Sequence, residues 1–574
     1  MFSILIRDTA RNLRNSIFKT NNLPNALIAF DYSSFTTKDF LYTNYDDTGT
    51  LLLRFMKYLA MEKSQFAPLI PTTIRYPDFF PVTDSRSFQS ELKKTDITQI
   101  PNLIIFAFTY KCNGDPQKFV GVINEIDWYC ENNLPKMDLD TILRTLYAFM
   151  FLLPGKVTHT NFYGKCLNEL VGKFDKDCPA EKFVKVCFYL GLNKKNQNGT
   201  VLLKKFLHSY LNQYLPELTP LDLSIVGNAA YKASIPINSS EFMDKITTEI
   251  LQLDPSAIDD SLLVNLLKIL RFNKVKSKGV CEKLDTICSQ EQLKKFEFMG
   301  LTHIFAYFTE FQWNQKQTCS KFIKEALSRI QSSKAYKRPK DMSTFLWCCA
   351  QLQQGDLLSS NDLRHIDSII LRMIERNEFK YHPDQLINSA LSLWMMGHKS
   401  RGLIAEVTSL RMNPNANNPD RAKLDSRHKV LLSSVSIEEP EWLMRGKKQY
   451  FVESLAAPDY LVNNRVGLKK AFDKLKEEGV EAELVSPIDG INVAGILVKL
   501  GEDQKCYLEV LEDEHYLKFN EVPVAIVQLK IRLLKHMGYN VVTVRANDVD
   551  KLDSIKSLIT GAEESSEVKQ NAAV

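Results

Sequence analysis

The sequence predicts a mainly α-helical protein in two parts: a right-handed α-solenoid of helix pairs that repeat about every 40 residues, and a small C-terminal α/β domain. Two observations lead to this prediction. Between residues 50 and 411, apolar residues recur three or four positions apart, which is the spacing of one helix face. After residue 470, the apolar residues gather in short runs that are typical of strands. With 44% hydrophobic and 25% charged residues among 574, the chain can bury a large core.

The repeat is defined by the first helix of each pair. The first apolar position of this helix recurs after 40, 40, 40, 40, 38, 41 and 44 residues. A second helical pattern lies between most of these positions, and a fainter copy of the first starts at Leu51. Because one amphipathic pair cannot bury both of its apolar faces, neighbouring pairs are expected to stack and to form a concave surface. The eight first positions are Leu103, Leu143, Phe183, Leu223, Leu263, Leu301, Met342 and Leu386.

Residues 1–30 predict an organellar import presequence. They contain four basic residues and one acidic residue, Asp8, and their apolar residues can lie on one face of a helix. A first repeat helix with solvated arginines is the alternative. The expected compartment is the mitochondrial matrix, with the plastid as the second choice. No apolar stretch approaches the roughly 18 residues that cross a bilayer, so membrane insertion is not expected.

The cysteines and histidines do not predict a metal site. The chain has 11 cysteines without a C-x-x-C pair, which disfavours a zinc ribbon and a disulfide framework. The histidines of the repeats have no carboxylate or cysteine at ligand spacing. Most cysteines therefore read as small buried hydrophobic residues in a reducing compartment. Neither a cofactor nor a small-molecule substrate is expected.

Residues 412–470 are expected to be a linker and connecting segment, because an Asn- and Pro-rich cluster at 412–420 ends the repeats. The C-terminal domain is expected at 471–560. Its predicted order is a helix ending at Gly479, three short strands, an apolar helix ending at Gly538, and a last strand. The polar tail 561–574 has no apolar residues for a core and is expected to be disordered.

Three segments of this domain resemble the RAP domain, an RNA-binding domain similar to the restriction-endonuclease-like fold. SPIDGI contains Asp489, YLEVLEDEHY contains Glu509 and His515, and VQLKIRLLKHMGYNVVTV contains Lys530 and Arg532. The last segment is the most specific match. Helical repeats followed by such a domain resemble organellar RAP proteins with octotricopeptide or heptatricopeptide repeats, and the FAST-kinase-domain proteins.

The resemblance implies RNA metabolism in an organelle, with organellar RNA, above all ribosomal RNA, and ribosomal or other ribonucleoprotein subunits as partners. Endonucleases of this fold use two carboxylates and a lysine around a divalent metal. Asp489 and Glu509 could supply the carboxylates, and Mg²⁺ would be required only for this nuclease alternative. Leu511 stands where the nuclease pattern has Lys, and leucine can neither bind a metal nor orient water. The expectation is therefore RNA binding without cleavage.

Two groups of residues are candidates for RNA contact. Residues 471–551 contain ten basic and fifteen acidic residues, a net charge of −5, which leaves +10 for the rest of the chain. The repeats and presequence should therefore supply most of the phosphate contacts. In the C-terminal domain, one candidate is a strip on one helix, formed by Lys530, Arg532 and Lys535. The alternative for this strip is a solvated helix face or a protein contact. His515 and Arg545 are two further candidates. In the repeats, polar residues near the start of the first helices are the candidates: Asn228, Asn265, Lys268 and Asn388.

Overall fold

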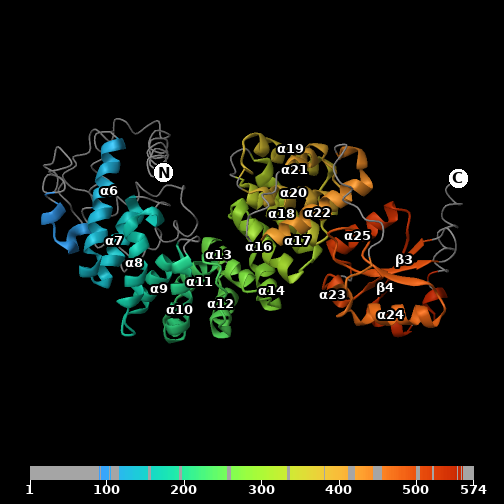
Figure 1. Ribbon diagram of the computed structural model, residues 1–574, viewed down its shortest axis with the longest axis horizontal. Helices are drawn as coiled ribbons and strands as arrows, with labels where there is room; N and C mark the ends of the chain where they lie inside the picture. The colour runs from blue at the N-terminus through green and yellow to red at the C-terminus, as the bar shows by residue number, and fades with distance from the viewer. Residues whose placement is uncertain are drawn as a thin grey trace. The chain divides into compact units, whose positions relative to one another are not determined.

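The computed structural model describes residues 90–559, without 91, 102–103, 105–115, 153–156, 193–196, 255–259, 333–336, 381, 411–419, 444–455, 500–504, 520–521, 552–553 and 558. The predictions for residues 1–30, for the copy at Leu51, for the first repeat position at Leu103 and for the tail 561–574 lie outside the described residues. Figure 1 shows the described chain as successive helices followed by a small sheet. None of the helices that the structure describes combines the length and the apolar character needed to cross a membrane.

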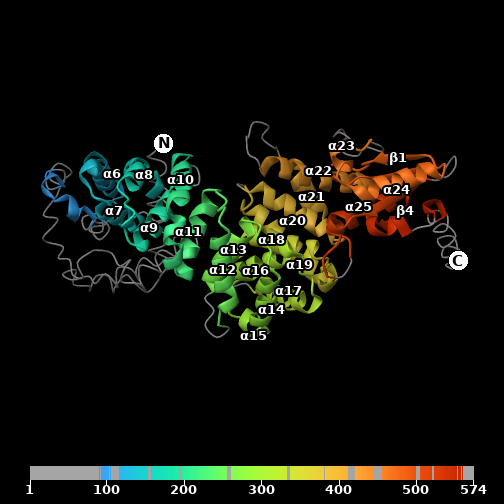
Figure 2. The same cartoon turned by 90° about the horizontal axis from the view of Figure 1, so that it is seen from below.

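The described chain forms two compact units, the first ending at Val275 and the second starting at Lys276. In the first unit, helices α9, α11 and α13 pack in succession, while α6, α8 and α10 form a second row. Figure 2 shows α6, α8 and α10 side by side along one edge. The helices of this unit are α6 (Pro116–Asn133), α7 (Leu139–Leu152), α8 (Asn161–Gly172), α9 (Ala180–Gly191), α10 (Gln197–Tyr214), α11 (Pro220–Lys232), α12 (Ser240–Gln252) and α13 (Asp260–Phe272).

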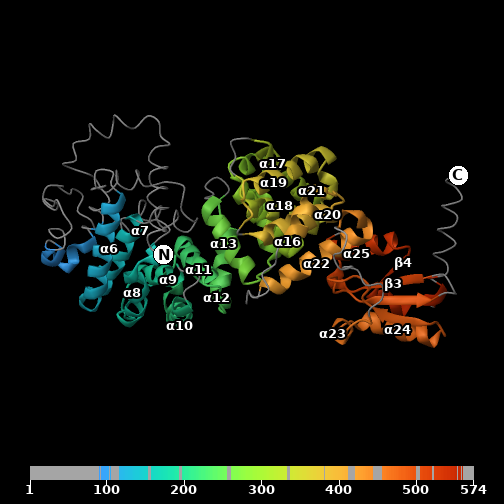
Figure 3. The same ribbon diagram turned by 45° about the horizontal axis from the view of Figure 1, so that its top comes forward.

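The second unit repeats this two-layer arrangement. Helices α16, α18, α20 and α22 pack in succession, and Figure 3 shows α17, α19 and α21 along the other side. The predicted repeat positions from Leu143 to Leu386 all fall in helices, and those from Phe183 onward fall in α9, α11, α13, α16, α18 and α20. This confirms the helix pairs in the described chain, while right-handedness stays a prediction. The helices before the sheet are α14 (Lys278–Ile287), α15 (Gln290–Leu293), α16 (Phe298–Phe311), α17 (Lys316–Gln331), α18 (Pro339–Gln351), α19 (Ser360–Glu375), α20 (Pro383–Met395), α21 (Arg401–Ser409) and α22 (Asp420–Glu438).

Local sequence explains where many of these helices begin. Thr219 and Asp222 form a capping box at the start of α11, and Ser359 and Asp362 form one at the start of α19, so the first free backbone N–H groups find acceptors. Pro220 occupies the first position of α11, where no N–H donor is needed. Short polar capping motifs therefore determine the repeat boundaries together with the spacing of the apolar residues.

Aspartates on α6, α14 and α19 connect successive repeats. Asp127 on α6 accepts hydrogen bonds from the backbone N–H of Asn161 (2.8 Å) and Phe162 (2.9 Å) at the start of α8. Asp285 on α14 accepts one from the Thr318 hydroxyl on α17 (2.8 Å). Asp367 on α19 accepts one from Ser400, the N-cap of α21 (2.8 Å). In each case, a carboxylate of one repeat binds the positive end of a helix in the next.

Helix α22 lies inside the segment predicted to be a linker. Four of its apolar residues (Val430, Leu431, Leu432 and Val435) are buried, and it packs against α20 as α20 packs against α18. It therefore extends the first row of helices by one, and the linker prediction is wrong for residues 420–438. The polar residues at both ends of this helix obscure its short apolar centre in the sequence.

The C-terminal domain has the predicted order of elements. The helices are α23 (Asp459–Val462), α24 (Val466–Glu477) and α25 (Ala525–His536), and the strands are β1 (Ala482–Val485), β2 (Gly495–Lys499), β3 (Lys505–Leu511) and β4 (Asn540–Arg545). The sheet order is β1-β2-β3-β4, with the first two pairs antiparallel and β3–β4 parallel. Gly479 and Gly538 follow α24 and α25 with φ of +72° and +87°, the left-handed conformation that ends a helix.

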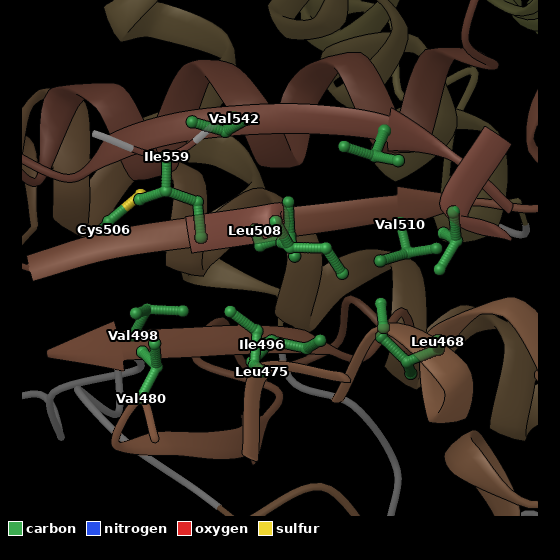
Figure 4. Close-up of a cluster of buried hydrophobic side chains, with 14 of the residues drawn as sticks. Leu468, Leu475, Val480, Ile496, Val498, Cys506, Leu508, Val510, Val542 and Ile559 are labelled. Atoms are coloured by element: carbon green, nitrogen blue, oxygen red, sulfur yellow. The ribbon is translucent and has the colours of Figure 1, made fainter. Parts of the chain in front are cut away.

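The main core of this domain lies between the sheet and α24. Leu468 and Leu475 of α24 pack against alternate residues of the central strands, among them Ile496, Leu508 and Val510 (Figure 4). Strand residues alternate between two faces, so Tyr507, Glu509 and Leu511 face the other side. That side is covered by α25, which also contacts α18, α20 and α22 of the repeats.

Candidate functional site

The second face of the sheet contains a buried ion pair. Glu509 on β3 and Lys530 on α25 are 0% and 1% exposed, and the Lys530 ammonium donates a hydrogen bond to Glu509 Oε2. Its Nζ also lies 4.8 Å from the centre of the Tyr507 ring. Glu509 Oε1 has no hydrogen-bond partner among the described residues. The two charges therefore compensate each other inside the domain and are not presented to solvent.

Burial governs the protonation of this pair. It raises the pKa of Glu509 and lowers the pKa of Lys530, and in each case the charge of the partner opposes the shift. The Arg465 guanidinium adds positive charge nearby and donates hydrogen bonds to the carbonyl groups of Ala494 and Val510. Sequence reasoning missed Arg465, because a single arginine before a helix has no spacing that distinguishes a buried anchor from a solvated side chain.

His515 belongs to the same buried region. Its Nδ1 accepts a hydrogen bond from the Glu512 backbone N–H at 3.0 Å, so the ring proton of the neutral form is on Nε2. Burial, with the positive charges of Arg465 and Lys530, lowers the pKa of His515 to about 4. The side chain is therefore neutral at physiological pH and holds the turn after β3 in place.

Arg532 lies two residues after Lys530, on nearly the opposite side of α25, and connects the domain to the repeats. Its guanidinium binds both carboxylate oxygens of Glu438 on α22, at 2.9 and 3.2 Å. It also donates to the carbonyl groups of Trp394 (2.9 Å) and Met395 (3.2 Å) at the end of α20. These carbonyls carry the negative end of the α20 dipole, which favours a cation there.

The expected strip of phosphate-binding residues on α25 is therefore not formed. Lys530 is buried, Arg532 is occupied by the repeats, and only Lys535 is exposed. The remaining candidate of this domain, Arg545, is partly buried and lies over the Tyr516 ring at 4.9 Å.

A comparison with family models now identifies the domain. Residues 508–560 match the model of the RAP domain. The C-terminal domain is a RAP domain. This confirms the resemblance drawn from Glu509, His515, Lys530 and Arg532, and RAP domains are generally associated with RNA binding. No curated protein matches the chain.

A loop of the RAP domain also contacts the repeats. The Phe519 ring lies 4.9 Å from the ring of Trp313, and Lys518 Nζ lies 4.4 Å from the ring centre of Phe311 at the end of α16. Together with Arg532, these contacts join the RAP domain to the ends of α16 and α20 and to α22 within the second unit. No local pattern in the sequence points to Glu438 or Trp313 as partners, because both are distant from the RAP domain along the chain.

The repeat candidates for RNA contact are placed as follows. Asn228 and Asn265 are buried, and Asn228 donates to the Ser224 carbonyl of its own helix at 2.8 Å. Lys268 is partly buried. Asn388 is also partly buried and accepts a hydrogen bond from Arg427 at 2.7 Å. None of these four side chains is exposed.

The two acids of the nuclease alternative have different surroundings. Asp489 is partly exposed and its carboxylate lies 3.7 Å from Lys429 on α22, whereas Glu509 is buried against Lys530. The described residues contain no group of three or more His, Cys, Asp or Glu side chains that could hold a metal ion. With the Lys530 ammonium bound to Glu509 and Leu511 buried beside it, the residues of this face do not fit a divalent metal.

Proposed function

We propose that this chain is an organellar RNA-binding protein that binds single-stranded RNA without cutting it and acts in ribosomal or messenger RNA metabolism. The observation that carries the proposal is a RAP domain joined to an array of helix pairs. A repeat array offers a long surface on which a strand can lie, and each repeat adds a similar set of contacts. The basic segment 1–30 supports an organellar location.

Binding without cleavage is supported by the surroundings of Glu509. A phosphodiester and a water molecule would have to reach this carboxylate, yet it is fully buried and already bound to Lys530. In the RAP domain the acidic residues outnumber the basic ones, so phosphate neutralisation would fall mainly to the repeats.

The binding proposal is tested by fluorescence anisotropy with a labelled single-stranded RNA and the full chain at several salt concentrations. Binding that weakens steadily as salt rises is expected, because counterions are released from the RNA. A wild-type chain without measurable affinity would overturn the proposal. For the cleavage question, the same RNA is incubated with Mg²⁺ or Mn²⁺ and analysed on a gel. Products that are lost in D489N/E509Q would establish the nuclease alternative.

We further propose a role at the organellar ribosome, either in its assembly or as a subunit. Sedimentation of organelle extracts separates the possibilities. Migration with a ribosomal subunit, at one copy per particle, favours a structural role. Recovery only in light RNA-containing fractions favours a processing factor and counts against the ribosomal role.

A further inference from the structure

The exposed face of α19 carries a row of arginines. Arg364, Ser368, Arg372 and Arg376 follow one another at intervals of four residues and are all exposed. Residues four apart lie on the same face of a helix, about 6 Å apart along its axis. The opposite face is apolar and buried, and it contains Leu363, Ile366, Ile370 and Met373. The packing of α19 therefore fixes the arginine row toward solvent.

The charges of this row are not neutralised by nearby carboxylates. Within the described residues, Arg364 donates to the Asn361 side chain (2.5 Å) and Arg372 to the Ser368 carbonyl (3.2 Å), and neither forms an ion pair. Arg376 likewise forms no ion pair within the described chain. Of the acids on α19, Asp362 caps its own helix and Asp367 binds Ser400 and His398.

The neighbouring elements add further positive charge. Burial, followed by the positive charge of Arg372, lowers the pKa of Lys337, which precedes α18, so these two cations lie close together. Lys324 on α17 and Arg401 on α21 are exposed on the helices of the same row. The exposed acids there are Glu375 on α19 and Glu406 on α21. Positive charge therefore exceeds negative charge across these three helices.

We propose that the arginines of this row bind phosphates of one single-stranded RNA: Arg372 and Arg376 bind neighbouring phosphates, and Arg364 binds a phosphate two steps from that of Arg372. This inference rests on the proposed RNA-binding function and places its phosphate contacts on the second-row helices, away from the first-row residues that the sequence suggested. The rise of about 6 Å between Arg372 and Arg376 is comparable to the spacing of neighbouring phosphates in an extended strand, and the rise of about 12 Å between Arg364 and Arg372 to twice that spacing. Arginine suits this role because its planar guanidinium can donate two parallel hydrogen bonds to one phosphate.

The test compares R364Q/R372Q/R376Q with the wild-type full chain in the anisotropy assay. The triple variant is expected to bind RNA roughly ten- to a hundredfold more weakly at low salt and to reduce the slope of log affinity against log salt by about 2, because three phosphate contacts are lost. R364K/R372K/R376K should retain the slope but bind more weakly than wild type. The matched control, K276Q/K294Q/K295Q, removes the same charge from exposed positions elsewhere in the second unit and should have a much smaller effect.

The outcomes separate this inference from the function on which it rests. The inference would be overturned, while RNA binding stays intact, if R364Q/R372Q/R376Q and the control K276Q/K294Q/K295Q lost equal RNA affinity or if neither lost any. Binding of a polyglutamate peptide that depends on the row, with unchanged RNA affinity, would also overturn it and would indicate an acidic protein partner. A wild-type chain that binds no RNA would remove both proposals. If the triple variant unfolds, the single variants R364Q, R372Q and R376Q are each expected to lower the slope by about 0.7.

Discussion

At the scale of single residues, the buried pair Glu509–Lys530 makes the RAP domain sensitive to the loss of either charge. In K530M, the Glu509 carboxylate stays buried without its counter-charge, so the free energy of unfolding should fall by about 3–5 kcal/mol. In E509L/K530M both charges are replaced by apolar groups, and most of this loss should be recovered. Urea unfolding of the full chain measures both variants. Equal destabilisation of the single and double variants would mean that packing, and not charge, makes the contribution.

His515 gives the domain a pH dependence. Its pKa in the folded chain is about 4, below the usual value of 6.5, so the unfolded chain binds the proton more readily. The stabilisation is therefore complete above pH 6.5 and is lost as the pH falls toward 4. In H515N, an amide oxygen can still accept the hydrogen bond from Glu512 and does not titrate. Between pH 7 and 4.5, the thermal unfolding temperature should fall more steeply for wild type than for H515N. Parallel plots of unfolding temperature against pH would contradict this role of His515.

Helix α25 shows why the contacts of the motif residues were harder to predict than their place in the motif. The motif correctly identified Lys530, Arg532 and Lys535, but residues two positions apart on a helix point in nearly opposite directions. The spacing therefore places Lys530 and Arg532 on different faces of the helix. The prediction of one common strip did not take this into account. That Lys530 would meet Glu509, 21 residues earlier, and Arg532 would meet Glu438, 94 residues earlier, depends on tertiary packing that no local pattern contains.

At the scale of elements, Arg532 connects α25 to α20 and α22. A lysine at this position keeps the charge but cannot bind both oxygens of Glu438 and two carbonyl groups together. R532K should therefore loosen this junction and increase hydrogen exchange in α25 and at the end of α20. K535Q, on the exposed side of the same helix, is the matched control and should leave exchange unchanged. Similar exchange in R532K and wild type would show that apolar packing alone holds the junction.

Most elements could be predicted because their apolar residues keep one period. The helices that begin at Leu139, Ala180 and Pro220 each contain the predicted repeat position, and the helix and strands of the RAP domain follow the order predicted from Gly479 to Gly538. Helix α22 was missed because its buried residues occupy a short central stretch. The Asp127, Asp285 and Asp367 contacts between repeats were missed for a related reason, since an aspartate inside a helix has the same local appearance whether it is solvated or capping a neighbour.

At the scale of the whole molecule, charge is divided unequally. The residues outside 471–551 carry +10, and the RAP domain carries −5. An RNA strand approaching the chain is therefore attracted by the net charge of the rest of the chain and repelled by that of this domain. At low ionic strength such forces reach tens of ångströms, about 30 Å at 0.01 M salt, and at 1 M they are screened within about 3 Å. The domain should consequently slow RNA association only when salt is low.

Neutralising exposed acids of the RAP domain tests this electrostatic division. D473N/E477Q/E514Q removes three negative charges from exposed positions. Its association rate with single-stranded RNA should exceed that of wild type by a few-fold near 0.01 M salt, and the difference should vanish near 1 M, because the acids act on RNA only through long-range repulsion. Stopped-flow fluorescence measures both rates. A gain that persists at 1 M salt would place these acids in direct contact with the RNA, and the RAP domain, not the repeats alone, would then belong to the binding surface.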